Sequence, residues 1–333
     1  MEILEHYDAD RMRTLMARGE RFWLRLHVPN PDVMEAVGEL LGLDHLAVED
    51  SLEFGQRPKI DDYPESALLV FYGARTVHHP DGSTVLAPTE FHFHITAQAI
   101  VSVRRHNPDT SQDVRRRVRL ADVDTAEEVL YRVLDALAST FAPGLQAIDD
   151  EVDALEDQIL EDPETDQRMR LLAIKHSLLA VRQVISAQRD VLAGHREVLE
   201  TLPGFSDSEG RETLRDIYDR VAIVSQQVDN VRESVSNALD LYVSAVANEL
   251  NQIIKVLTIV ATFFLPLTFV TGFFGQNFGW MVRHVTSPGA FVLLGLGINV
   301  VVVTGLWTWL SRAGYVDWHE FLGRGGRRTA KRP

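Results

Sequence analysis

The chain has 333 residues, 48 of them acidic and 33 basic, and its formal net charge at pH 7 is −15. A surface this acidic repels phosphate backbones and attracts cations, which argues against a nucleic-acid partner. The sequence has no cysteine, so disulfides, thiolate metal sites and cysteine nucleophiles are excluded, and any metal ligand must be an oxygen or a histidine. The first eight residues lack a basic segment followed by an apolar core, so we expect no cleavable signal peptide.

Residues 1–122 are predicted to form an α/β cytoplasmic domain. Apolar runs predict strands at 21–28, 67–77, 91–95 and 100–104. A short helix is expected over 31–41, with Asn30 as its N-cap. We find no glycine-rich phosphate loop and no nucleophile motif in this domain, so we do not expect an enzyme.

His92 and His94 lie on one face of the predicted strand at 91–95. Two histidines at this spacing could bind a transition metal. The alternative is a half-buried pair whose ring nitrogens are satisfied by neighbouring polar groups. The sequence leaves both interpretations open.

Residues 123–204 are predicted to form an antiparallel helical pair that turns at 162–164 and ends at Pro203-Gly204. Its two apolar stripes are Leu145, Ile148, Val152, Leu155 and Ile159, and Leu171, Ile174, Leu178 and Val181. The first helix also carries an acidic run: Asp149, Asp150, Glu151, Asp153, Glu156, Asp157, Glu161 and Asp162. Such a run is either an ordinary solvated face or a diffuse cation-collecting surface.

Residues 205–255 are predicted to form a stalk helix with an apolar heptad seam. The seam consists of Leu214, Ile217, Val221, Val224, Val228, Val231, Val235, Ala238, Tyr242 and Ala245. A polar stripe recurs every seven residues at Asn230, Asn237, Ser244 and Asn251, with Asp240 near the same face. Neither proline nor glycine occurs between Arg211 and Pro266, so the helix is expected to continue unbroken into the next segment.

Two apolar segments, 256–274 and 290–310, have the length that a helix needs to cross a bilayer. The loop between them, 275–289, is too short to be a domain, so both flanking parts lie on one side of the membrane. The tail, 311–333, is rich in arginine, and the positive-inside rule places it and the N-terminal part in the cytoplasm. Three tryptophans fall where interfacial aromatics are expected: Trp280, Trp307 and Trp309.

Several motifs occur in a distinctive order. They are His45-Leu46-Ala47-Val48-Glu49-Asp50, Gln56-Arg57-Pro58-Lys59, Asp149-Asp150-Glu151, Asp216-Ile217-Tyr218-Asp219, Lys255-Val256-Leu257-Thr258-Ile259, Pro266-Leu267-Thr268-Phe269 and Gly275-Gln276-Asn277-Phe278. In these motifs and their order, the chain resembles the CorA family of magnesium and cobalt transporters, in the CorA/ZntB-like superfamily. The resemblance covers nearly the whole length of the chain. The resemblance implies an α+β membrane protein that forms a homopentameric funnel in the cell inner membrane and takes up Mg²⁺ and Co²⁺.

The resemblance also implies which residues meet the ion. The selectivity loop would be Gly275, Gln276 and Asn277, with the Asn277 amide contacting the waters of a hydrated ion. The central pore would be lined by Gly272, Thr268, Leu265, Leu257, Ile254 and Asn251, with Asp240 in the funnel below. Mg²⁺ gives up its water reluctantly, so a ring of neutral amides suits it.

Members of this family also bind regulatory Mg²⁺ between cytoplasmic domains. By resemblance, Asp216 would supply one carboxylate. The matching partner region, around 77–79, offers histidines instead of an acid, and Asp81 is the candidate substitute.

The loop departs from the family pattern, in which Gly-Met-Asn is followed by acids. Here Gln276 takes the middle position, and Trp280, Arg283 and His284 follow without an acid. A basic mouth lowers the local cation concentration. A Zn²⁺ transporter of the ZntB type, with or without proton coupling, therefore remains an alternative. A membrane-anchored helical scaffold is a remote one, since it explains neither Pro266 nor the turn.

Overall fold

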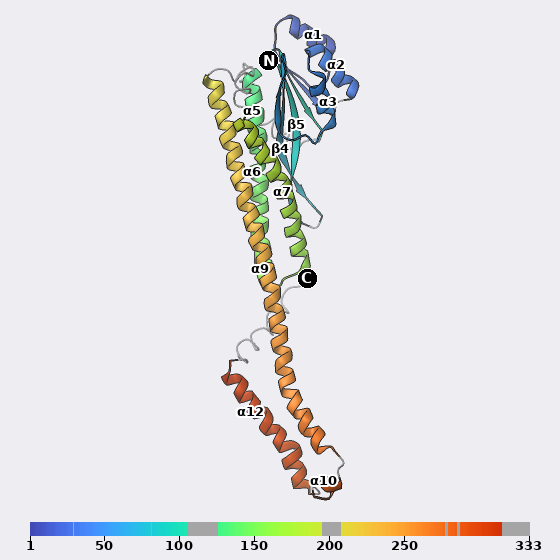
Figure 1. Ribbon diagram of the computed structural model, residues 1–333, viewed down its shortest axis with the longest axis vertical. Coiled ribbons are helices and arrows are strands. Elements are labelled where there is room, and N and C mark those ends of the chain that lie inside the picture. The colour runs from blue at the N-terminus through green and yellow to red at the C-terminus, as the bar shows by residue number, and fades with distance from the viewer. Residues whose placement is uncertain are drawn as a thin grey trace, which may run out of the picture. The chain divides into compact units, whose positions relative to one another are not determined.

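The computed structural model describes residues 1–28, 30–80, 82–105, 126–194, 208–276, 279–284 and 287–314. It divides into two compact units, Met1–Ala245 and Val246–Pro333, which we describe separately (Figure 1). Two candidate site residues, Asp81 and Asn277, lie outside the described residues, as does most of the predicted tail.

A six-stranded mixed sheet organises the first unit. Its strands are β1 (Glu2–Leu4), β2 (Phe22–His27), β3 (Lys59–Asp62), β4 (Ser66–His78), β5 (Thr84–Thr96) and β6 (Ala99–Arg104). Their order across the sheet is β1-β2-β6-β5-β4-β3. The β1–β2 and β2–β6 pairs are parallel, and the other pairs are antiparallel.

Three short helices cover one face of this sheet: α1 (Ala9–Ala17), α2 (Pro31–Leu41) and α3 (His45–Glu53) (Figure 1). The helix predicted over 31–41 is confirmed, and the side chain of Asn30 accepts a hydrogen bond from the Asp32 backbone nitrogen. All four predicted strands are present. The sequence prediction did not include β1, β3, α1 or α3.

Strand β5 is longer than predicted because it extends through Pro88. Proline has no backbone N–H to donate, so it is tolerated in a strand only where one side is free of a partner. Strand β6 pairs with β5 only between Phe91 and Ile95, so Pro88 lies where β5 has β4 alone as its neighbour.

Long helices pack on the other face of the sheet. They are α5 (Ala126–Ser139), α6 (Phe141–Glu161), α7 (Thr165–Gly194) and the part of α9 (Ser208–Phe274) that belongs to this unit (Figure 1). The predicted helical pair over 123–204 is thus wrong in one respect, because its first part is a separate helix, α5. Pro143 explains the break: proline fits the first turn of α6 but not the interior of one continuous helix.

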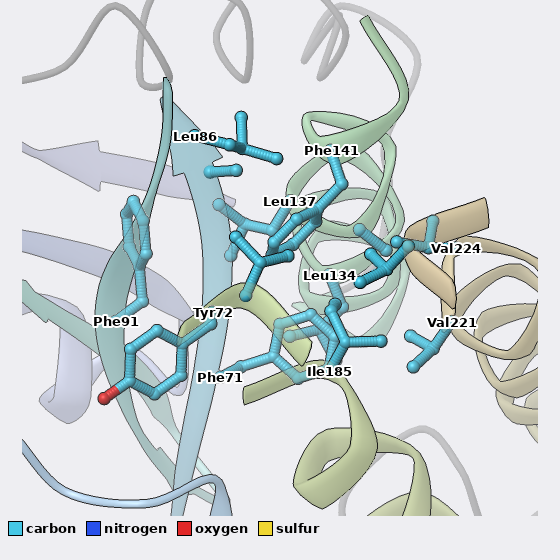
Figure 2. Close-up of a cluster of buried hydrophobic side chains, with 14 of the residues drawn as sticks. Phe71, Tyr72, Leu86, Phe91, Leu134, Leu137, Phe141, Ile185, Val221 and Val224 are labelled. Atoms are coloured by element: carbon cyan, nitrogen blue, oxygen red, sulfur yellow. The ribbon is translucent and has the colours of Figure 1, made fainter. Parts of the chain in front are cut away.

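The core of the first unit lies between the sheet and these helices. Figure 2 shows Phe71 and Leu86 of the sheet facing Leu134 and Leu137 of α5, with Val221 of α9 behind them. The close approach of α6 requires Gly144, since a Cβ there would lie 2.3 Å from Leu86 Cδ1. The predicted stripes of α6 and α7 are buried, and the heptad seam of α9 is buried from Leu214 to Ala238.

Polar side chains of the helices bind the part of β4 that extends beyond β3. Buried Gln188 of α7 accepts a hydrogen bond from the Tyr72 nitrogen through Oε1 (2.8 Å), and its Nε2 lies 3.5 Å from the Tyr72 oxygen. Thr140 Oγ1 accepts one from the Ala74 nitrogen (2.7 Å). These contacts satisfy backbone groups that would otherwise be buried without partners.

The second unit is a helical hairpin. It contains the end of α9, α10 (Gly279–His284), α11 (Pro288–Ala290), the π-helix η2 (Phe291–Gly297) and α12 (Ile298–Arg312). Helices over Leu214–Phe274 and Pro288–Arg312 are long and apolar enough to cross a membrane, with a mean hydropathy of 2.2 in windows that are not buried inside the protein. The end of the first predicted span, at residue 274, is confirmed; the second span begins as a π-helix, which the sequence did not indicate.

Candidate functional site

The end of α9 has two different faces. One face is half-buried and consists of Ile259, Thr262, Phe263, Pro266, Leu267, Val270 and Phe274. Phe263 contacts Trp307 of α12, with ring centroids 6.4 Å apart, so this face packs against the second apolar helix. The steps of three and four residues are those of a helix-packing stripe.

The six predicted pore residues on α9 lie on the other face. Asn251, Ile254, Leu257, Leu265, Thr268 and Gly272 are all exposed. Leu257 is 67% and Leu265 75% exposed, which is extreme for leucine. At about 100° per residue, this group is centred about 180° from the face that packs on α12. The hairpin therefore leaves these residues free to face something else.

The exposed face continues the polar stripe of the stalk in one heptad register. Steps of seven residues lead from Asn230 through Asn237, Ser244, Asn251, Thr258 and Leu265 to Gly272. Every one of these positions is exposed, and so is Asp240. Because α9 is a single helix over Ser208–Phe274, this seven-residue series runs without a break from the stalk into the apolar span, and on a straight helix it drifts by about 20° per step. The sequence indicated the stalk part of this stripe, but its register with the span depends on the unbroken helix.

Thr268 presents an oxygen on this face. Its Oγ1 donates to the backbone oxygen of Phe264 at 2.7 Å, which occupies the hydroxyl proton and leaves lone pairs as acceptors. A cation or the water around it needs such acceptors. Past Thr268, α9 ends at Phe274, and the nitrogen of the next residue, Gly275, donates to the Thr271 oxygen at 2.9 Å. A Cβ at Gly275 would lie 3.0 Å from that oxygen, so the turn is closely packed there.

The loop after α9 is basic in its described residues. Gln276 is exposed and its nitrogen lies 3.3 Å from the Phe273 oxygen. In α10, Trp280 stacks on His284 with centroids 4.7 Å apart, and Arg283 lies between them in sequence. No acidic residue occurs from 275 to 289, so nothing in this loop offsets the charge of Arg283.

Asp216 lies at the edge of a hollow of about 530 Å³ in the first unit. The hollow is lined by Tyr131, Ser139, Ala142, Pro143, Asp216, Asp219, Arg220, Ile223, Val224 and Gln227. Arg220 forms an ion pair with Asp135 of α5. Burial raises the pKa of Tyr131, and the charges of Asp135 and Asp216 add to the shift. Within the described residues, no group of three metal-binding side chains occurs around Asp216 or elsewhere.

His92 and His94 are fully buried, in contrast to the half-exposed pair that a surface metal site would need. His92 Nε2 lies 2.6 Å from Glu90 Oε1, and its Nδ1 lies 3.1 Å from Ser51 Oγ. Ser51 Oγ also lies 2.8 Å from His94 Nε2. The two rings thus attach α3 to β5, which is close to the alternative that the sequence left open. It differs in that both rings are fully buried and that His94 Nδ1 has no hydrogen-bond partner among the described residues.

Glu90 anchors this polar chain. Burial alone would raise the pKa of its carboxyl, but the hydrogen bonds from His92, Gly55 and Gln56 hold that pKa below its ordinary value. The backbone nitrogens of Gly55 and Gln56 lie 2.6 and 3.0 Å from the carboxylate. The motif around Gln56 is therefore structural, and so is Lys59, which pairs with Asp50 at 2.5 Å.

One member of the acidic run on α6 is not solvated. Glu151 has a side chain only 9% exposed and pairs with Arg170 of α7 at 3.0 Å. It also accepts a hydrogen bond from the Thr84 nitrogen at 2.7 Å, which ties the β4–β5 hairpin to two helices. Sequence reasoning missed this role because a buried glutamate in an acidic run has no distinguishing pattern.

The chain is similar to known transport proteins. A family model described as "CorA-like Mg2+ transporter protein" matches residues 19–312. The Cobalt/magnesium transport protein CorA of Thermotoga maritima is 33% identical over 290 residues, which are 84% of this chain and 80% of that protein. The Zinc transport protein ZntB of Klebsiella pneumoniae is 26% identical over 295 residues, 87% of this chain and 86% of that one.

Solved structures agree on the fold. The complete structure of the CorA magnesium transporter from Methanocaldococcus jannaschii matches with a TM-score of 0.74 at 18% identity, covering 88% of this chain and 91% of that one. The structure of full-length CmaX matches with a TM-score of 0.66 at 22% identity, covering 87% of both chains.

Proposed function

Because the chain belongs to the CorA-like Mg²⁺ transporter family and is a divalent-cation transporter rather than an enzyme, we propose that Mg²⁺, with Co²⁺ as a second substrate, passes along the exposed face of α9. The observation that carries this proposal is the single heptad register from Asn230 to Gly272. This face is exposed in the single chain and carries polar groups at intervals through an apolar span. Such a face is suited to surround an aqueous path when several copies assemble.

In the proposed assembly, five copies place this face around a common axis. The funnel stands in the cell inner membrane with both termini in the cytoplasm. The heptad repeat of α9 supports this arrangement, because a seven-residue stripe stays aligned with an axis only when the helices supercoil around it.

The ion meets the selectivity loop first. Gln276 and Asn277 offer neutral amides, which can hydrogen-bond to the waters of a hydrated ion without stripping them. Gly272 and then Thr268 come next along the path. Gly272 leaves space, and Thr268 adds oxygen acceptors. Leu265, Leu257 and Ile254 then form apolar constrictions that resist water, and such constrictions gate by dewetting. Asn251 and Asp240 receive the ion on the cytoplasmic side.

Regulation by cytoplasmic Mg²⁺ is proposed at Asp216. Its exposed carboxylate at the edge of the hollow supports this role, and a partner from a neighbouring copy would complete the site. Asp81 stays the candidate substitute for the family's partner carboxylate, which does not carry over, because it lies close in sequence to the matching region at 77–79.

Zn²⁺ transport of the ZntB type is the second candidate. It is favoured by the basic loop around Arg283 and by the relatives named as zinc transport proteins. A positive mouth disfavours a pathway that works by concentrating cations electrostatically.

Ion flux into proteoliposomes tests the proposal. Initial rates for Mg²⁺, Co²⁺ and Zn²⁺ are compared with and without a pH gradient. We expect Mg²⁺ and Co²⁺ flux that does not depend on the gradient. Flux of Zn²⁺ alone, accelerated by the gradient, would favour the second candidate, and absence of flux for every ion would overturn both.

A further inference from the structure

The short helix α10 lies at the turn of the hairpin, where the chain meets the membrane surface (Figure 1). The helix before it ends at Phe274 and the next one begins at Pro288, and both are long and apolar enough to cross a bilayer. A connection of this length cannot carry α10 far from the ends of the two spans. Its side chains are therefore close to the lipid headgroups on that side.

Helix α10 contributes nothing to a packed core. None of its residues is buried, and the large apolar side chains of Trp280 and Val282 are 70% and 57% exposed. Contact with water is unfavourable for side chains of this size, whereas tryptophan is enriched at the boundary between hydrocarbon and water. The apolar groups of α10 thus suit a lipid surface.

The polar groups of α10 gather on one side. At about 100° per residue, Trp280, Met281 and Val282 occupy one arc of the helix, and Arg283 and His284 occupy the other, next to Trp280. The rings of Trp280 and His284 stack with centroids 4.7 Å apart. His284 Nδ1 lies 2.9 Å from the Trp280 oxygen and can donate to it, which leaves Nε2 as the second polar atom of the ring.

Arg283 is the charged group of this side. It is exposed and, within the part of the chain that the structure describes, forms no ion pair. The sequence from 275 to 289 contains no acid that could compete for it. A guanidinium binds a phosphate through two parallel N–H donors, and it gives up water more readily than an ammonium does.

The combination of these groups favours a lipid over a second copy of the chain. A basic polar side beside a tryptophan is typical of helices that lie in the interface of anionic membranes. A second α10 would instead bring another guanidinium and again no carboxylate, so like charges would meet.

We propose that α10 binds an anionic phospholipid. Arg283 takes the phosphate of the headgroup, and Trp280 and Val282 enter the boundary of the bilayer. His284 Nε2 adds a second donor when the ring is protonated.

The bound lipid changes the charge at the loop. Arg283 lowers the local concentration of cations, and a phosphate beside it cancels that effect. The lipid thus supplies the negative charge that the residues from 275 to 289 lack. This consequence for transport rests on the proposed function, whereas the lipid contact does not.

Fluorescence quenching in the full-length protein tests the contact. The chain has no cysteine, so a fluorophore on Gly279→Cys is unique. A Cβ at Gly279 meets nothing within 4 Å, and this position lies one turn before Arg283. The protein is reconstituted with phosphatidylcholine or phosphatidylglycerol that carries a doxyl quencher close to the headgroup. The ratio of the two quenching efficiencies gives the preference of this place for the anionic lipid.

We expect a preference of about fivefold for phosphatidylglycerol, which is what one basic side chain near an anionic surface provides. It should fall toward one in Arg283→Gln, and it should persist in Arg283→Lys. The matched control is Arg312→Gln at the far end of α12, which should keep the wild-type ratio. A wild-type ratio of one, or a preference kept in Arg283→Gln, would overturn binding at Arg283. Absence of quenching by either lipid would show that α10 does not face the bilayer and would overturn the proposal as well.

Mg²⁺ flux tests the consequence. An anionic surface concentrates Mg²⁺ for every variant, so the informative quantity is the half-saturating Mg²⁺ concentration in phosphatidylcholine vesicles divided by that in vesicles containing phosphatidylglycerol. This quotient should be several-fold larger in the wild type and in Arg312→Gln than in Arg283→Gln, because only an intact Arg283 has a charge for the lipid to cancel. Equal quotients in all three would overturn the effect on transport. Absence of flux in the wild type would count against the proposed function and leave the quenching result standing.

Discussion

At the scale of single residues, the acids of α6 differ in what they do. Asp153 and Asp157 are exposed, as an ordinary charged face requires. Glu151 lies between Arg170 and the Thr84 nitrogen, and removing it would take this acceptor from a partly buried guanidinium, which also contacts the Gly82 oxygen at 3.4 Å, and from a buried amide. Groups left unpaired in this way cost more than the bond itself contributes.

We predict that Glu151→Ala lowers the free energy of unfolding by about 1–3 kcal/mol, because the buried Thr84 nitrogen and the partly buried Arg170 guanidinium lose their shared acceptor. The matched control is Asp153→Ala on the same helix, with an expected change within about 0.5 kcal/mol. Denaturant unfolding of the full chain in detergent measures both. Equal losses for the two variants would show that the Glu151 contacts do not stabilise the fold.

The histidine chain gives the first unit a dependence on pH. Burial lowers the pKa of His94 to about 3, and the nearby His92 adds to the shift. An unfolded histidine titrates near 6.5, so below that pH the unfolded chain binds a proton that folded His94 refuses. Stability therefore falls as the pH falls from about 6.5 toward 3. The lowered pKa of Glu90 acts in the same direction below about 4.5.

We expect His94 to contribute a loss of about 1 kcal/mol per pH unit across this window. Unfolding midpoints between pH 7 and pH 5 measure the slope. His94→Leu should flatten it, whereas exposed His78→Leu should leave it unchanged. A slope that is the same in both variants and in the wild type would contradict the assignment to His94.

At the scale of elements, α9 combines a packing seam, a hairpin face and an exposed stripe in one helix. Leu265 is the most exposed of its predicted constriction residues. If it closes an aqueous path, a polar side chain there lowers the barrier to water and ions. Val301 on α12 is similarly exposed, at 71%, but lies off that face.

We predict that Leu265→Ser raises the initial Mg²⁺ flux several-fold and that Val301→Ser leaves it near the wild-type rate. Flux in proteoliposomes at matched protein content measures this. If the two serines had the same effect, Leu265 would not lie at a constriction.

Much of the helical architecture could be predicted from the sequence. The heptad seam, the α6 and α7 stripes and the helix after Asn30 follow directly from spacing and capping. The separation of α5 from α6 could not be predicted in this way, because an apolar stripe does not reveal that a new helix begins just before Pro143. The π-helix η2 could not be predicted either, since residues 291–297 form an apolar run whether their backbone bonds span four residues or five.

At the scale of the whole molecule, the candidate site could be predicted only in part. The proposed pore residues were carried over from the family resemblance, and the structure adds that all six of those on the end of α9 are exposed. The partners of His92 could not be foreseen, since Ser51 is 41 residues away from it in sequence. The pentamer and its regulatory site stay predictions.

Asp216 provides the test at this scale. We predict that Mg²⁺ protects the full-length wild-type protein from limited proteolysis and that Asp216→Ala loses most of this protection. Asp153→Ala, which removes an exposed acid elsewhere, should keep it. Unchanged protection in Asp216→Ala would show that the regulatory metal binds at other residues.

Pro266 has a mechanical consequence. It has no N–H to donate, so the Thr262 oxygen lacks its helical partner and α9 bends at lower energy there than in the proline-free turns before it. Pro266 faces α12, while Leu265 and Thr268 flank it on the exposed side. A displacement of α12 would therefore act on α9 at the turn where bending costs least, beside two of the residues that we propose line the ion path.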